Sequence, residues 1–543
     1  MQRFAQLKSQ FELASELPQN FPKEVINEAA KLSKEPFNKD KNREDFRHLH
    51  TICIDPLGAR DHDDAISVEE TKSGYVLGVH IADLSYFVKP GSALDKEAQK
   101  RAYTQYLPWG SFPMFPEIIS ANLCSLKENE NRFSFSCIIN LDRKCKILKY
   151  RFTKGLIKVS RSITYEKAME LFEKKDKHIY LLAKVAFKLK KSREENGLLE
   201  MGSTEYQCQF SKKGEPLCIV SRQSEKSNSW IEECMLAANK CCALELQKRK
   251  LKGIYRIHEA PDPEDLAELM QGEPTLFFDS PIDPNKLLRS YRGDNSQDKR
   301  IFQLYAHLVK KANGNPILIN RILRSMQKAQ YSPECSGHFA LHWRDYAHFT
   351  APIRRYADLW CHRELCKATK TNQIIRKGKA SLAKTQTADI CSNLNDAEIK
   401  NQKIERKALK LCASYLLQDQ VGQTFSGEVQ GIEEFGIFVS ISTNTVALAE
   451  GLVHLRDIPG DYYVYNEARG ILVGKRSGKR FKRGDKVTVK LVRVNPIKGE
   501  NDFEICNTRN APRNITRNAY ARNAPARNAP ACEVPAKKRR FGR

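Results

Sequence analysis

Four aspartates lie within ten residues of this chain, at Asp55, Asp61, Asp63 and Asp64. Carboxylates this crowded disfavour one another's charge unless a cation lies among them, so the segment constrains how the chain can fold. On a straight strand Asp61 and Asp63 would share one face and Asp64 would take the other. The four side chains can therefore converge only if the Pro-Leu-Gly sequence after the first aspartate bends the segment into a loop.

A bent loop with convergent carboxylates is typical of a site for a hard divalent cation. Mg²⁺ is bound by a few carboxylates together with substrate phosphate, and we expect that metal here. A calcium loop of the EF-hand type that starts at Asp61 is excluded, because it needs Gly in place of Ile66 and Glu in place of Lys72. The alternative is an aspartate-rich surface turn that binds no metal.

The composition of the whole chain points to a polyanionic partner. The 543 residues include 91 Lys and Arg against 65 Asp and Glu, a formal charge of +26, which favours nucleic acid. Neither an apolar run long enough to cross a membrane nor a phosphate-binding or dinucleotide-binding motif is present, so we expect no membrane anchor and no nucleotide cofactor. The sixteen cysteines are scattered and form no Cys-x-x-Cys pair. This spacing argues against a structural zinc site, and we expect the protein in a reducing cytoplasm.

Changes in composition and in the pattern of apolar residues divide the chain into four regions. Residues 1–48 are polar and helix-prone and are interpreted as a leader or linker. Residues 49–420 first alternate short β-branched runs with glycine and proline and then become helical, which predicts an α+β domain with a mixed sheet. Residues 421–506 predict a five-stranded barrel of the OB type. Residues 507–543 hold ten basic residues and one acid in a repetitive sequence and are predicted to be disordered.

A second motif places two arginines where an anion is expected. Thr350 can cap a helix with Pro352 in its first turn, so Arg354 and Arg355 would lie at the positive end of the helix dipole. A phosphate would compensate this arrangement. The alternative is an ordinary surface ion pair between Arg354 and Asp358, which are four residues apart.

Tyr106 precedes a proline turn at Pro108 and could present its ring to a nucleobase. The alternative is a half-buried packing residue, the usual state of a tyrosine with polar neighbours.

The predicted barrel carries aromatic and basic residues in alternation. Phe435, Phe438 and His454 lie on candidate strands, and a basic run that begins with Lys475 and Arg476 follows them. Stacking rings beside a positive groove are typical of single-stranded nucleic-acid binding. The alternative is a set of core aromatics beside a solvated basic loop.

Together these segments resemble the ribonuclease II and ribonuclease R (RNB) exoribonucleases, with ribonuclease R the closer match. The resemblance covers about residues 20–505. The matching segments are Ile54–Ala65, Val79–Val88, Tyr106–Pro108, Pro113–Pro116, Leu123–Leu126, Ile231–Met235, Tyr255–His258, Gly337–Phe339 and His348–Tyr356. Within the barrel, Asp461–Tyr463 and Gly474–Gly478 are similar to the S1 RNA-binding domain that ends ribonuclease R.

The resemblance implies processive hydrolysis of RNA from its 3′ end to nucleoside 5′-monophosphates, with water as the attacking group. It implies an RNB catalytic domain followed by an S1-type barrel, two Mg²⁺ ions during catalysis with Mn²⁺ as a substitute, and single-stranded RNA with a free 3′ end as partner. We expect a monomer, with the ribosome or an RNA-degradation machinery as further partners. The implied roles are metal and catalytic carboxylates for Asp55, Asp61, Asp63 and Asp64, base stacking for Tyr106, and phosphate binding for Arg354.

The chain also departs from the family pattern. Ala351 stands where the family has Ser, Ala340 where it has Gly, and His342 with Trp343 where it has smaller residues. The cold-shock domains that precede the catalytic domain of ribonuclease R are absent from the sequence, which makes the handling of structured RNA an open question. Two other functions stay open: an RNA-binding regulator with weak catalysis, and a phosphodiesterase that acts mainly on DNA.

Overall fold

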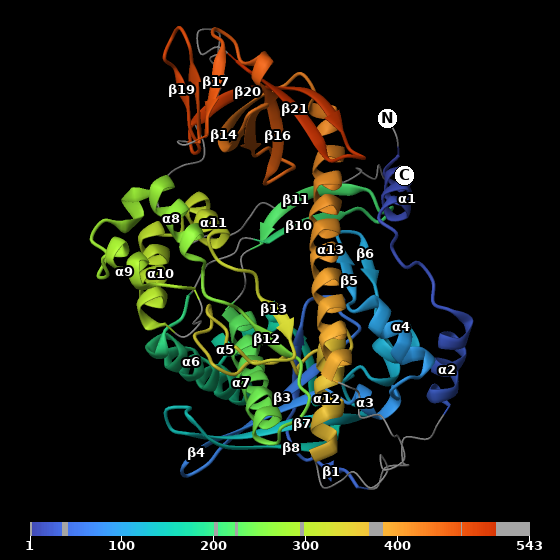
Figure 1. Cartoon of the computed structure of the whole chain (residues 1–543). Coiled ribbons are helices and arrows are strands. Elements are labelled where there is room, and N and C mark those ends of the chain that lie inside the picture. The colour runs from blue at the N-terminus through green and yellow to red at the C-terminus, as the bar shows by residue number, and fades with distance from the viewer. Residues whose placement is uncertain are drawn as a thin grey trace, which may run out of the picture.

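The structure, a computed structural model, describes residues 3–34, 42–199, 205–222, 226–293, 298–368, 384–467 and 470–506. A mixed sheet with surrounding helices lies at one end of the molecule and a closed barrel at the other (Figure 1). This arrangement confirms the predicted α+β fold. The predicted disordered tail, residues 507–543, lies outside the described residues. Within the described ranges, no helix is long and apolar enough to cross a membrane.

A seven-stranded sheet of order β1-β8-β7-β4-β3-β2-β9 forms the half of the molecule away from the barrel. Its strands are β1 (Glu44–Asp45), β2 (Ile52–Asp55), β3 (Asp64–Glu70), β4 (Gly74–Ala82), β7 (Asn131–Asp142), β8 (Ile147–Lys158) and β9 (Arg161–Thr164). The edge strands β1 and β9 pair in parallel with β8 and β2, and the other neighbours are antiparallel. Strand β4 is rich in β-branched and aromatic residues and is buried along almost its whole length, as a central strand requires.

Helices and short hairpins surround this sheet. Helix α6 contacts β3, and α7 contacts β4 and β7. The helices of this half are α3 (Leu84–Phe87), α4 (Ala93–Arg101), α5 (Tyr165–Glu173), α6 (Lys177–Asn196), α7 (Lys226–Lys248) and α12 (Tyr356–Ala368), with the π-helix η2 (Ile118–Leu123). The short paired strands are β5 (Gln105–Leu107) with β6 (Gly110–Phe112), β10 (Glu205–Phe210) with β11 (Pro216–Arg222), and β12 (Tyr255–Ile257) with β13 (Gln330–Ser332).

A separate group of helices projects from the half that contains the seven-stranded sheet and has its own hydrophobic core around Tyr305 and Phe339. Its members are α8 (Pro263–Gly272), η3 (Pro274–Phe277), α9 (Pro284–Ser290), α10 (Lys299–Ala312) and α11 (Pro316–Arg324).

The segment interpreted as a leader or linker, residues 1–48, contains two packed helices, α1 (Phe4–Ala14) and α2 (Lys23–Ser33). Phe4, Leu7 and Phe11 form an apolar stripe at helical spacing, and all three are buried. The interpretation as a linker is therefore wrong for α1, because this stripe is packed in the hydrophobic core.

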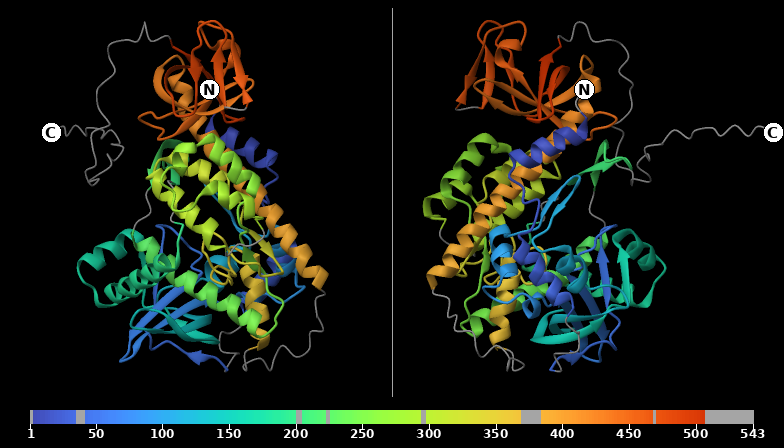
Figure 2. Two further views of the ribbon diagram at one scale, coloured as in Figure 1. Left: turned by 60° about the vertical axis from the view of Figure 1, so that its left-hand side comes forward. Right: turned by 90° about the vertical axis from the view of Figure 1, so that its right-hand side faces the viewer.

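Helix α13 (Lys384–Leu417) joins the two halves of the molecule (Figure 2). Its 34 residues correspond to a rod of about 50 Å. The barrel beyond it has the order β14-β15-β16-β21-β20, which confirms the predicted five strands. These strands are β14 (Thr424–Glu433), β15 (Gly436–Ile441), β16 (Ala449–His454), β20 (Lys486–Asn495) and β21 (Glu500–Ile505), and the short helices η4 (Gln418–Gln420) and η5 (Leu455–Asp457) flank them. A small sheet beside the barrel contains β17 (Tyr463–Asn466), β18 (Ile471–Gly474) and β19 (Arg480–Phe481).

Candidate active site

The aspartate segment forms a bent loop between the end of β2 at Asp55 and the start of β3 at Asp64. The bend predicted after the first aspartate is confirmed: Gly58 has φ +86°, a left-handed conformation that favours glycine. Ser125 fastens the loop, since its Oγ donates to the Arg60 carbonyl at 2.7 Å and accepts from the His62 amide at 3.1 Å. The loop is thus held at two consecutive peptide groups and is not a free surface turn.

Three of the four aspartates bind a partner by the side chain. Asp63 is buried, and its Oδ1 accepts the Ile353 amide hydrogen at 2.8 Å. Asp61 Oδ2 accepts a hydrogen bond of 3.1 Å from the hydroxyl of Tyr106. The remaining contact is a 2.6 Å hydrogen bond between Asp55 Oδ2 and His62 Nδ1, which raises the pKa of that imidazole.

The positive charge near this group of carboxylates does not fully offset their burial and mutual repulsion. Burial raises the pKa of Asp63 well above its usual range. Burial, followed by the charge of Asp55, raises the pKa of Asp64 to about 7. Both shifts have the sign expected when an anion is moved out of water without a sufficient counter-charge.

Within the described ranges, no set of three or more His, Cys, Asp or Glu side chains is arranged closely enough to hold a metal ion. The expectation that all four aspartates converge is therefore not met in this arrangement, because Asp61 and Asp55 turn toward Tyr106 and His62. A divalent cation nevertheless fits the chemistry of the site. Asp63 Oδ2 is buried without a hydrogen-bond partner among the described residues, and oxygen atoms of this kind are the ligands that Mg²⁺ prefers.

Arg354 lies directly over the buried carboxylate. Its Nε is 3.5 Å from Asp63 Oδ2, and about half of its side chain, 47%, is exposed. The predicted helix start is wrong here, since α12 begins only at Tyr356. The preceding residues form a turn because their amides bind carboxylates: Ala351 donates to Asp358 and Ile353 to Asp63. Arg354 therefore projects from a turn fixed to the aspartate loop.

Arg355, predicted to bind RNA, does not reach this site. Its Nη2 donates to Asp358 Oδ1 at 2.7 Å, and Asp358 itself is fully buried. Tyr103 pairs with Arg355 through an isolated β-bridge. The ion pair suggested at sequence level thus exists, but with Arg355 in place of Arg354 as the partner of Asp358. This arginine holds the turn together.

Tyr106 lies at the site, on the hairpin of β5 and β6. Its side chain is partly exposed, at 43% for the residue, while its hydroxyl binds Asp61. An exposed ring with an anchored hydroxyl is available for stacking on a base.

Sequence reasoning missed the contacts that hold this hairpin. At its tip, Trp109 Nε1 donates to Glu12 Oε1 at 2.8 Å. The rings of Phe4 and Phe11, also on α1, pack edge-on against Trp109 at centroid distances of 5.8 and 5.5 Å. Only the apolar stripe of α1 could have indicated such a contact, and it does not name the partner.

The barrel places its predicted aromatic residues near one another. Phe435 is 55% exposed, and its ring meets that of Phe438 edge-on with centroids 6.0 Å apart. His454 pairs with Gly436 at the adjoining strand end and lies 3.9 Å from Asp502. Phe435 is therefore not a core residue, which removes that alternative for it.

Lys475 and Arg476 do not lie on the barrel strands but in the loop that follows β18 in the small neighbouring sheet. Asp461 organises this loop by accepting the amide hydrogens of Arg476 and Ser477. Lys475 Nζ is 5.1 Å from the ring centroid of Tyr462, which is 64% exposed. The sequence indicated the two basic residues but gave Tyr462 no separate role.

Residues 43–371, more than half of the chain, match the family described as RNB domain. The chain belongs to the RNB family. The match spans both halves of the candidate site, the aspartate loop and the arginine turn. Residues 418–505, which contain the barrel, match the family described as S1 RNA binding domain.

Named relatives agree with this assignment. Ribonuclease R 1 of Lactococcus lactis subsp. lactis (strain IL1403) is 32% identical over 499 residues, which cover 89% of this chain and 59% of the relative. Ribonuclease R 2 of the same organism is 31% identical over 90% of this chain and 74% of its own length. The RNB-family chain thus spans about three-fifths of the first relative. Among solved structures, Mycoplasma genitalium RNase R in complex with ribose methylated single-stranded RNA matches with a TM-score of 0.83 and 26% identity, covering 92% of this chain and 78% of that one.

Proposed function

We propose that this RNB-family chain is a processive 3′→5′ exoribonuclease that hydrolyses single-stranded RNA to nucleoside 5′-monophosphates. The observation that carries the proposal is the placement of Arg354, half exposed, over the buried carboxylate of Asp63. An arginine beside a group of carboxylates is suited to a phosphate with bound divalent cations, because each charge in such an assembly offsets another.

Each side chain of the site has a separate role in hydrolysis. Tyr106 offers its ring to the terminal base, and Arg354 contacts the phosphate to be cleaved. The Ile353 amide fixes Asp63 beside that phosphate. When bound to the carboxylates, Mg²⁺ would activate the attacking water and neutralise the charge that develops during the reaction. Mn²⁺ would substitute for it.

The reaction needs no covalent enzyme intermediate. A water oxygen forms a bond to phosphorus, the bond from phosphorus to the 3′ oxygen breaks, and a proton passes to that leaving oxygen. The products are a nucleoside 5′-monophosphate and an RNA that is one residue shorter. Repetition without release is favoured if the barrel holds the same strand through Phe435 and Tyr462 while its 3′ end is cut.

The test compares the full chain with Asp63→Asn on 5′-labelled single-stranded RNA, with Mg²⁺ or with EDTA. The substitution keeps the oxygen that accepts the Ile353 amide and removes the charge, so cleavage should stop while RNA binding remains. Asp279→Asn is a matched control, because the side chain of Asp279 is 90% exposed and outside the candidate site.

The expected result is stepwise shortening from the 3′ end by the wild type and by Asp279→Asn only. RNA that is bound but left intact by the wild type in the presence of Mg²⁺ would favour the second candidate, an RNA-binding regulator. Equal cleavage of a matched DNA strand would refute the preference for RNA.

A further inference from the structure

The loop that carries the catalytic carboxylates has a second, basic side. Residues 59–63 run without regular secondary structure. Asp61 and Asp63 contact Tyr106 and Arg354, whereas Arg60 and His62 line a separate cavity. One short segment is therefore acidic on the side of the reaction and basic on the other.

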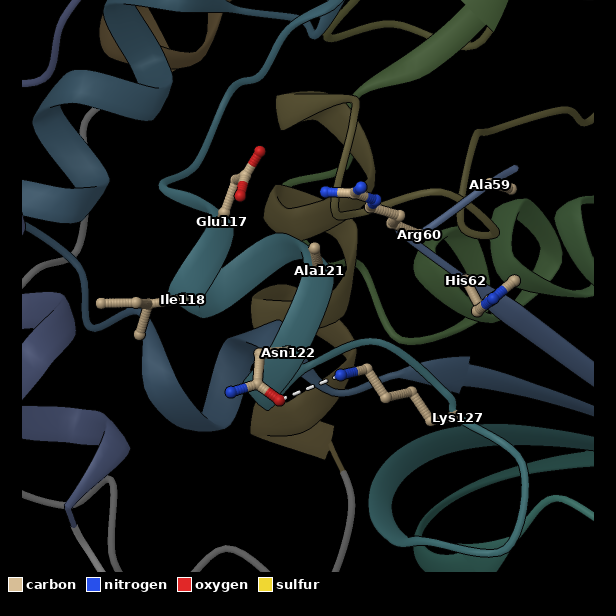
Figure 3. A pocket seen from close by; sticks show the side chains of 8 residues that line it. All are labelled: Ala59, Arg60, His62, Glu117, Ile118, Ala121, Asn122 and Lys127. Carbon is tan, nitrogen blue, oxygen red and sulfur yellow. Dashed lines mark hydrogen bonds between the residues drawn. The ribbon is translucent and has the colours of Figure 1, made fainter.

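The cavity on the basic side has a volume of about 510 Å³ and is bounded by the loop, by the π-helix η2 and by Lys127 (Figure 3). This volume is within the range of sites for small molecules. His62 connects the cavity with the reaction site, because the same imidazole that lines the cavity donates a 2.6 Å hydrogen bond from its Nδ1 to Asp55 Oδ2.

The charges in the cavity favour an anion. Within the part of the chain that the structure describes, the guanidinium of Arg60 has no hydrogen bond or ion pair. Among the residues with described positions, the ammonium of Lys127 binds only the neutral Asn122 Oδ1, at 3.1 Å. Among the described residues that line the cavity, Glu117 is the single acid, and Figure 3 draws its side chain at the end where Arg60 lies and away from Lys127, so the two cations exceed the one carboxylate.

We propose that this cavity binds the phosphate monoester of the nucleoside 5′-monophosphate product as it leaves the site. The inference rests on the proposed function. A phosphate monoester carries a charge of about −1.5 to −2 at pH 7, so it is repelled by the carboxylates on one side of the loop and attracted by Arg60 and Lys127 on the other.

The experiment measures binding of AMP to the full chain by isothermal titration calorimetry, in the absence of RNA. The variants are Arg60→Ala with Lys127→Ala as the test and Lys149→Ala, an exposed basic residue on β8, as the control. Tyr106→Ala identifies any AMP that stacks in the catalytic site instead. Adenosine and inorganic phosphate are titrated in parallel to show which part of AMP is recognised.

We expect the double variant to lose at least tenfold in AMP affinity, with Lys149→Ala close to the wild type. A loss of AMP affinity in Tyr106→Ala with none in the double variant would overturn the inference, because AMP would then bind in the catalytic site. Adenosine should bind much more weakly than AMP, while inorganic phosphate should compete with it. Equal AMP affinity in the double variant and the wild type would overturn the inference, and so would adenosine that binds as well as AMP. An RNA cleavage assay on the same samples separates the two proposals: RNA left intact by a wild type that binds AMP here would overturn the exonuclease but not the anion site.

Discussion

Asp64→Asn should stabilise the metal-free protein, and the gain should grow with pH. The pKa of this half-buried carboxyl is raised from 3.8 to about 7, chiefly by its loss of hydration and then by the charge of Asp55. A carboxyl with a raised pKa in the folded state contributes stability below pH 3.8, and that contribution is lost as the pH rises toward 7. The asparagine variant has no such loss, because its side chain does not ionise.

The magnitude follows from the pKa difference. Each tenfold change in an equilibrium constant corresponds to about 1.4 kcal/mol. The pKa interval from 3.8 to about 7 therefore lowers the free energy of unfolding of the wild type by up to about 4 kcal/mol at pH 8. Between pH 5 and pH 8 the variant should gain about 3 kcal/mol relative to the wild type. Urea unfolding in EDTA at these two pH values measures the free energies of unfolding, and Asp279→Asn, which alters an exposed carboxylate, should follow the wild type.

Added Mg²⁺ provides the complementary measurement. It should stabilise the wild type more at pH 8 than at pH 5, because only the ionised carboxyl binds it well, and it should stabilise Asp64→Asn less. If the variant and the wild type have the same pH profile in EDTA, the carboxyl does not experience an uncompensated buried charge. The electrostatic case for a metal at this loop would then fail.

Three further predictions concern the groups around the loop. Arg355→Ala should lower the free energy of unfolding by about 3–5 kcal/mol, since it leaves a buried carboxylate unpaired, whereas Arg354→Ala should leave urea unfolding nearly unchanged and reduce RNA cleavage. Tyr106→Ala should weaken binding of an RNA 3′ end by about 1–3 kcal/mol in a fluorescence anisotropy titration, while Tyr106→Phe, which keeps the ring, should bind almost normally; equal affinities for the two variants would exclude stacking. Trp109→Ala should destabilise the protein by about 3–5 kcal/mol and also raise the KM for RNA, because α1 braces the hairpin through Glu12; an unchanged KM would leave α1 a purely structural role.

Much of the fold followed from local patterns. The alternation of β-branched residues around β4 and the glycine corners of residues 421–506 indicated the sheet and the barrel before any coordinates. These patterns are readable because strand burial repeats every two residues. The start of α12 was predicted too early, because hydrogen bonds from distant carboxylates shape the turn before Tyr356. Such contacts join residues as far apart in sequence as Asp63 and Ile353 and leave no periodic signal.

The sequence by itself determined the chemistry available to this RNB-family protein: the crowded aspartates, the paired arginines, the tyrosine before a proline and the excess of positive charge. Residue type and spacing are enough for that, because the carboxylate and guanidinium groups carry their properties wherever they lie. Only the tertiary structure decided which of two adjacent arginines lies beside the aspartate loop and which pairs with the buried Asp358. It also decided that α1 packs on the hairpin tip, and that one loop is acidic on one side and basic on the other. These outcomes depend on the direction of each side chain and on its burial, and both are set by contacts between segments that are remote in the chain.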